Sequence, residues 1–226
     1  MTGTAVCFDL DDTLFDYHEY ARAGLRSAAT LVERRTGRRV HDDLVDLYFD
    51  QSVDEGTFDL LLERYHLPRL DVEMLVEAFH DSSGELPPYP ETEAVLDALG
   101  ENHRLGVVTD GRGGHGKLDR LGMREHFDVV VVTPNGDHSK EHRVVFERVL
   151  DDLGVAPGDA AYVGDDPRVD FHHPNDLGMT TVRLRRGRYV DLDAPTAAHE
   201  PDHEIDHLGD LLTDVPAIAT EPRRAD

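Results

Sequence analysis

The strongest constraint on the fold is a series of short apolar runs, each separated from the next by a stretch with helical spacing. The runs occupy residues 4–9, 104–109, 128–133, 160–164 and 179–184, with a weaker one at 203–206. The helical stretches cover about 91–101, 114–122, 141–153, 170–177 and 207–213. Short continuous apolar runs are typical of buried parallel strands, and strands that alternate with helices are typical of a sheet covered on both faces. We therefore predict an α/β fold with a doubly wound parallel sheet.

Residues 16–88 interrupt this alternation. Apolar residues recur there at helical spacing in several segments, with no strand pattern between them. The Pro-rich segment 86–90 is typical of a stiff return linker. We predict an all-helical cap over 16–88, inserted into a core formed by 1–15 and 89–213, and a frayed tail over 214–226.

The charge balance excludes some partners. The chain has 47 acidic and 23 basic residues, a net charge of −24, and only two lysines, Lys117 and Lys140. Nucleic-acid binding that ignores sequence depends on cations that neutralise phosphates, so we expect neither a nucleic-acid partner nor an anionic membrane partner. Without a basic, apolar leader at the start, we expect a cytoplasmic protein. The acidic, lysine-poor composition predicts a halophilic one, because salt screens the repulsion.

Acidic residues end two of the predicted strands. Asp9 and Asp11 are separated by one residue, which places them on one face of an extended chain, and Asp165 follows the fourth run. Carboxyl ends of neighbouring parallel strands meet at the crevice where open α/β sheets bind ligands. Two carboxylates there repel each other, so the pKa of at least one should rise unless a cation intervenes. Mg²⁺ prefers such hard oxygen ligands.

Phosphate-binding residues are expected after the second strand and before a later helix. Thr109 offers a hydroxyl, and Gly111 lets backbone N–H groups approach an anion closely. Lys140 precedes a helical run, and a lysine kept in so lysine-poor a chain indicates a specific use of its compact charge. Taken singly, each feature is more often a solvated surface pair, a turn or an exposed side chain. Their coincidence at strand ends favours a site.

The motifs resemble those of the haloacid dehalogenase-like (HAD) hydrolase superfamily, in the subclass with a helical C1 cap after the first strand. The resemblance spans residues 4 to about 185 and rests on four motifs in order: Asp9-Leu10-Asp11-Asp12-Thr13-Leu14, Thr109, Lys140, and Gly164-Asp165 with Asp170.

The resemblance implies a role for each matching residue. Asp9 would attack phosphorus and form an aspartyl-phosphate, and Asp11 would act as acid and then base. Thr109, Lys140 and the backbone amides around Asp110 and Gly111 would hold the phosphoryl group. Mg²⁺ would be bound by Asp9, the Asp11 carbonyl and Asp165, with Asp170 and Asp166 in the surrounding layer.

The predicted function is therefore hydrolysis of a small phosphorylated metabolite, with the cap excluding larger substrates. A phosphomutase of the same superfamily remains open, as does a non-catalytic phospho-ligand binder. A 2-haloacid dehalogenase is less consistent with the presence of both Asp11 and Asp165. Arg22 and Arg26, one helical turn apart in the cap, are candidate substrate contacts, although surface arginines are the simpler interpretation. The histidines at 18, 115, 172 and 173 are interpreted as surface residues.

Overall fold

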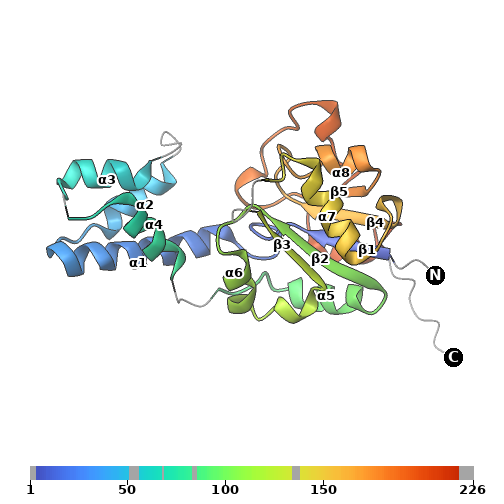
Figure 1. The fold of residues 1–226 in the computed structure, drawn as a ribbon, viewed down its shortest axis with the longest axis horizontal. Coiled ribbons are helices and arrows are strands. Elements are labelled where there is room, and N and C mark those ends of the chain that lie inside the picture. The colour runs from blue at the N-terminus through green and yellow to red at the C-terminus, as the bar shows by residue number, and fades with distance from the viewer. Residues whose placement is uncertain (1–3, 51–55, 68, 83–85, 134–137, 219–226) are drawn as a thin grey trace. The chain divides into compact units, whose positions relative to one another are not determined.

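The computed structural model confirms the α/β fold with its doubly wound parallel sheet. It describes residues 4–50, 56–67, 69–82, 86–133 and 138–218. Six parallel strands lie in the order β3-β2-β1-β4-β5-β6 (Figure 1). They are β1 Thr4–Phe8, β2 His103–Thr109, β3 Val129–Val132, β4 Ala160–Gly164, β5 Thr180–Leu184 and β6 His203–Ile205. Each lies within one or two residues of a predicted apolar run.

Strand β1 lies at the point in the sheet where the strand order reverses. It pairs with β2 on one side and β4 on the other, so that Cys7 lies opposite both Gly106 and Tyr162. The chain runs outward through β2 and β3, and then returns to the other side of β1 for the remaining strands. The two crossovers leave in opposite directions, which opens a crevice at the carboxyl ends of β1 and β4.

Helices cover the sheet because each carries an apolar stripe. The core helices are α5 Thr92–Gly100, α6 Gly114–Leu121, α7 Arg143–Leu153 and α8 His172–Leu177. Helix α7 buries Phe146 and Val149, one turn apart, in a cluster with Cys7 and Tyr162. Helix α5 lies on the opposite side of the sheet from α7 (Figure 1). Burial raises the pKa of the Cys7 thiol to about 12, which fits an unreactive core residue.

Residues 18–85 form a second compact unit. Its helices are α1 Tyr17–Thr36, α2 His41–Phe49, α3 Thr57–Tyr65 and α4 Val72–His80. Phe79 of α4 is the centre of this unit, with the rings of Tyr20, Tyr48 and Phe58 packed around it at centroid distances of 5.7, 5.9 and 6.2 Å. The other unit consists of 1–17 and 86–226, where 1–15 and 89–213 were predicted.

The prediction of a frayed segment from 214 onward was wrong for residues 214–218. Val215 and Ile218 are buried, and the imidazole of His103 joins the Ile218 carbonyl to the start of β2 at 3.2 Å. Apolar burial therefore fixes this part of the chain. The rest of the predicted tail, 219–226, lies outside the described residues. None of the helices in the described ranges is long and apolar enough to span a membrane.

Candidate active site

Asp9 and Lys140 form a buried ion pair at the end of β1. The strand ends at Phe8, and the Asp9 amide donates to the Val163 carbonyl at 2.8 Å, which carries the ladder one residue further. The Lys140 ammonium contacts the Asp9 carboxylate and also Asp170, at 2.7 Å. The Tyr162 hydroxyl donates to the same Asp170 oxygen at 3.3 Å. One cation thus links the residues that follow β1 and β4.

The Asp110 side chain holds Lys140 in position. Its carboxylate accepts two hydrogen bonds from the Lys140 backbone N–H, at 3.0 and 3.1 Å, and one from the hydroxyl of Thr133. Thr133 follows β3 directly, so the carboxylate connects the ends of β2 and β3 to the lysine. The sequence placed Asp110 among the phosphate-binding residues through its backbone, and did not anticipate this use of its side chain.

Asp165 has the features of a cation ligand. It follows β4, is 2% exposed, and one of its oxygens accepts a hydrogen bond from Thr13 at 3.4 Å. Its other oxygen is buried and finds no hydrogen-bond partner among the described residues. Burial, together with the charges of Asp9 and Asp170, raises the pKa of Asp165 well above its ordinary value. A carboxylate oxygen left without a partner in so negative a site fits a bound divalent cation.

The pKa of Asp9 is raised as well. It rises from 3.8 to about 7, chiefly because the carboxylate is buried; Lys140 opposes the rise, and the charges of Asp170 and Asp11 add to it. Lys140 itself is buried, which alone would lower its pKa, yet the attraction of Asp170 and Asp9 raises that pKa well above its ordinary value. The lysine therefore stays charged, and one ammonium does not balance the carboxylates around it.

Asp170 and Asp166 differ in their contacts. Asp170 is fully buried, and its second oxygen accepts a hydrogen bond from the Asp166 amide at 2.9 Å. A side chain at Gly164 would collide with this carboxylate, which explains the glycine. The Asp166 carboxylate instead pairs with the guanidinium of Arg168, at 2.9 and 2.8 Å. Asp170 thus forms an ion pair with Lys140, whereas the charge of Asp166 is balanced by Arg168.

Thr109 and Gly111 form a tight turn after β2. The Gly111 amide, which the sequence assigned to phosphate, donates to the Thr109 hydroxyl oxygen at 3.0 Å. Because its oxygen accepts this hydrogen bond, the Thr109 hydroxyl can use its O–H to donate a hydrogen bond to a ligand. A Cβ atom added at Gly111 would lie 2.6 Å from an Asp11 oxygen, 2.9 Å from the Lys117 ammonium and 3.1 Å from the Thr109 hydroxyl. The missing side chain therefore lets three polar groups meet.

Lys117 is a site residue that the sequence analysis did not assign. It lies in α6, is 2% exposed, and its ammonium is 2.6 and 2.7 Å from the two oxygens of Asp11. The rarity of lysine in the chain could have indicated this role, because Lys117 and Lys140 are the only lysines in the sequence. Each of the two lysines is paired with a different aspartate of the first motif, Lys140 with Asp9 and Lys117 with Asp11.

Two arginines that follow β5 clamp the loop after β1. Asp12 is buried in a left-handed conformation, with φ of 63°, and forms an ion pair with Arg188 at 2.5 Å. Arg186 donates to the carbonyl of Asp12 at 3.3 Å and to that of Thr13, and its guanidinium lies 3.6 Å from the Tyr89 ring centroid. The arginine-rich sequence after the last long strand was the only signal for these roles.

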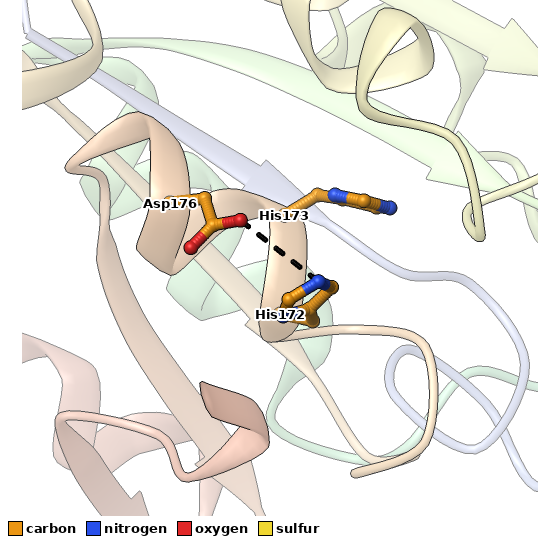
Figure 2. Close-up of side chains that lie close together, drawn as sticks. All are labelled: His172, His173 and Asp176. Atoms are coloured by element: carbon orange, nitrogen blue, oxygen red, sulfur yellow. Dashed lines mark ion pairs between the residues drawn. The ribbon is translucent and has the colours of Figure 1, made fainter. Parts of the chain in front are cut away.

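A histidine cluster lies on α8. One ligand atom each from His172, His173 and Asp176 lies within 4.8 Å of the others, and His172 and Asp176 form an ion pair at 3.8 Å. Figure 2 shows the His172 ring turned toward Asp176 and the His173 ring pointing away from both. His173 bonds instead to the Glu141 carbonyl at 2.8 Å. The two histidines are half-buried rather than fully at the surface.

The remaining candidates lie elsewhere. His115 is exposed and His18 is half-buried. In the helical unit, Arg22 pairs with Glu19 at 3.0 Å and lies over the Phe49 ring, and Arg26 lines a surface hollow of about 400 Å³.

Comparison with known proteins agrees with this geometry. The model of one family, described as haloacid dehalogenase-like hydrolase, matches residues 6–184. This chain belongs to that family. A relative from Methanopyrus kandleri, named glyceraldehyde 3-phosphate phosphatase, is 34% identical over 96% of this chain and 99% of its own length. A relative from Halopiger xanaduensis, named ribulose-1,5-bisphosphate 5-phosphatase, is 26% identical over 92% and 98%.

A solved structure supports the same membership. The crystal structure of a HAD phosphatase from Thermococcus onnurineus has a TM-score of 0.64 and 25% identity, covering 96% of this hydrolase and all of the other chain. The predicted family is therefore confirmed.

Proposed function

We propose that this HAD hydrolase is a phosphatase of small phosphorylated sugars that forms an aspartyl-phosphate on Asp9. The observation that carries the proposal is the meeting of Asp9, Lys140 and Asp165 at the carboxyl ends of β1 and β4, with Thr109 at the end of neighbouring β2. Phosphoryl transfer depends mainly on positioning and on neutralising charge. A nucleophilic carboxylate beside a buried ammonium supplies both.

The residues divide the reaction into two steps. In the first, an Asp9 oxygen attacks phosphorus, the bond to the sugar oxygen breaks, and Asp11 gives that oxygen a proton. In the second, water attacks the phosphorus of the aspartyl-phosphate and Asp11 takes the proton of the water. Asp9 is then free again and inorganic phosphate leaves. Thr109 and Lys140 hold phosphoryl oxygens throughout.

The site fits Mg²⁺. Asp9, Asp165 and the backbone carbonyl of Asp11 would hold it. The observation that favours this set is the Asp165 oxygen for which the described residues provide no hydrogen-bond partner. When bound, Mg²⁺ supplies positive charge that offsets the carboxylates and the phosphate oxygens. Asp170 belongs to the surrounding layer through Lys140, and Asp166 through the hydrogen bond that its backbone N–H donates to the Asp170 carboxylate.

The substrate class is drawn from the relatives. Their names specify a triose phosphate and a pentulose bisphosphate, both small sugar phosphates. We propose glyceraldehyde 3-phosphate as the first substrate to test, since the more similar of the two relatives bears that name. We further propose that the protein acts in the cytoplasm of a salt-adapted organism, in line with its net charge of −24.

Phosphate release from a panel of sugar phosphates, measured in molar KCl with Mg²⁺ and then with EDTA, tests this function. We expect turnover with Mg²⁺, little with EDTA, and none in Asp9→Asn, whose fold is checked by circular dichroism. The matched control is Asp119→Asn, which removes an exposed carboxylate from α6 and should leave turnover unchanged. Turnover in Asp9→Asn would rule out the covalent route, and halide release from 2-haloacids would indicate a dehalogenase instead.

A further inference from the structure

The first motif contains a second buried ion pair, between Lys117 and Asp11. Both oxygens of Asp11 lie within hydrogen-bonding distance of one ammonium, at 2.6 and 2.7 Å. The Lys117 side chain is 2% exposed and that of Asp11 is 12% exposed. A surface ion pair between flexible side chains does little to fix geometry, but a buried pair holds each partner in one place. We propose that Lys117 is the positioning residue for the acid–base carboxylate Asp11, a role that rests on the proposed phosphatase function.

Stability alone does not explain this lysine. Removing two charges from water costs free energy, so buried ion pairs seldom stabilise a fold more than apolar side chains of the same size. The chain also uses arginine at its other 21 basic positions, counting 23 basic residues less two lysines. A guanidinium is planar and bulky, whereas an ammonium is compact enough to contact both oxygens of one carboxylate from a single atom.

The surroundings of the pair point the Asp11 carboxylate at the phosphate-binding turn. The position of a Cβ at Gly111 would be 2.6 Å from an Asp11 oxygen and 3.1 Å from the Thr109 hydroxyl, so both groups lie close to this glycine and to each other. The ammonium also lies over the rings of Tyr17 and Phe15, at 5.4 and 5.8 Å from their centroids. Lys117 is thus enclosed by aromatic rings and Asp11.

A fixed Asp11 matters most in the second step of the reaction. There, water attacks phosphorus, the bond from phosphorus to Asp9 breaks, and the proton of the water passes to Asp11. The carboxylate must accept that proton along one direction, and misplacing a catalytic group by about 1 Å can slow a step on the order of 100-fold. The first step depends less on Asp11 when the leaving group is a stable anion such as p-nitrophenolate. Loss of Lys117 should therefore slow dephosphorylation most.

The test compares Lys117→Met with the wild type, using p-nitrophenyl phosphate as substrate. We expect kcat to fall roughly 10- to 100-fold and KM to fall with it, because slowing only the second step leaves kcat/KM unchanged. Acid-quenched mass spectrometry should show a larger fraction of the variant trapped as aspartyl-phosphate at steady state. Lys117→Gln, which keeps an N–H donor group and loses the charge, should have a kcat between those of the wild type and Lys117→Met. It also covers the case in which the methionine variant does not fold. Arg120→Met, which removes a cation from the same helix, is the control and should match the wild type.

A double-mutant cycle decides whether Lys117 acts through Asp11. When Asp11→Asn is already present, adding Lys117→Met should change kcat less than about twofold, because the two positions act as one unit. Full additivity, or an unchanged share of trapped aspartyl-phosphate in Lys117→Met and Lys117→Gln, would overturn the inference. These outcomes are distinct from failure of the proposed function, which would appear as a wild type that neither releases phosphate nor forms the aspartyl-phosphate.

Discussion

At the scale of single residues, the site is a set of paired charges with one place left open. Asp9 is matched by Lys140 and Asp11 by Lys117, while one oxygen of Asp165 has no partner among the described residues. Buried charges without partners are costly, so each pairing restricts what can be substituted nearby. The Asp165 oxygen, in turn, favours a cation as the ligand of this site.

Gly111 should be far less tolerant of a methyl group than Gly116. Gly111→Ala would push a carbon to within 2.6 Å of an Asp11 oxygen and 2.9 Å of the Lys117 ammonium. We expect kcat to fall about 100-fold, as misplaced catalytic groups do. In Gly116→Ala the new carbon meets nothing within 4 Å inside α6. That variant should keep its activity and gain about 0.5–1 kcal/mol in unfolding free energy, measured by urea titration. Equal activity in both variants would contradict the close contact of Gly111 with Asp11 and Lys117.

Mg²⁺ should raise the melting temperature more at pH 8 than at pH 5. The pKa of Asp9 is raised from 3.8 to about 7 by burial, so the folded state without metal holds a proton that the unfolded state releases. The resulting stability is complete below about pH 4 and is lost as the pH rises through about 7. A divalent cation favours the ionised carboxylates and offsets this loss where it is greatest. Asp165→Asn should abolish most of the difference, and a shift that is equal at both pH values would argue against the cation site.

At the scale of elements, the loop after β1 is fixed from two directions. Arg186 and Arg188 hold its backbone and Asp12 from the segment after β5, and Thr13 reaches Asp165 after β4. Each short strand therefore fixes the position of the residue that follows its carboxyl end. Contacts between the loops then fix the orientation of that residue's side chain. In the helical unit the equivalent constraint is the ring of Phe79, packed directly on the backbone of α1 at Gly24.

Gly24→Ala should destabilise the helical unit. The new carbon would lie 2.5 to 2.7 Å from three atoms of the Phe79 ring, which is itself held by the rings of Tyr20 and Tyr48. Overpacking of this kind costs about 1–3 kcal/mol. Hydrogen exchange should show faster exchange in α1 and α4, with the sheet unchanged. Gly100→Ala, where the nearest atom is 3.8 Å away, is the control. Uniform protection in Gly24→Ala would mean that the ring moves aside without cost.

The sequence predicted the strands and the residues at their ends, because apolar runs and motif spacing are local properties. Asp9, Thr109 and Asp165 follow from where each strand stops, and Lys140 from its place before a helical run. The pairing of Asp11 with Lys117 could not be predicted in this way, because it depends on how helix α6 packs beside the end of β1. The same holds for the Asp110 side chain and for the arginine clamp, whose contacts join segments more than twenty residues apart.

At the scale of the whole molecule, both lysines are buried, whereas most of the acidic residues in the described ranges are not. The net charge is −24, and exposed arginines pair locally along helices, as Arg143 does with Glu147 at 2.8 Å. Such exposed pairs contribute little to stability, so the excess of acidic residues leaves a general repulsion.

Potassium chloride should therefore stabilise the fold. The Debye length falls from about 10 Å at 0.1 M to about 3 Å at 1 M, so repulsion between surface carboxylates is largely screened. We expect the melting temperature, followed by circular dichroism, to rise steadily over this range. Sucrose at equal osmolality, which does not screen charge, separates screening from solute exclusion. A melting temperature that barely changes with salt would count against a salt-adapted protein.

The placement of the lysines has a chemical consequence for an enzyme proposed to handle an aldehyde. Sugar aldehydes glycate proteins by condensing with accessible side-chain amines. The side-chain amines of the only two lysines in this chain are 2% and 3% exposed, and both are engaged by carboxylates. A surface that carries guanidinium groups in place of lysine amines therefore presents no lysine that could attack the carbonyl of such a substrate.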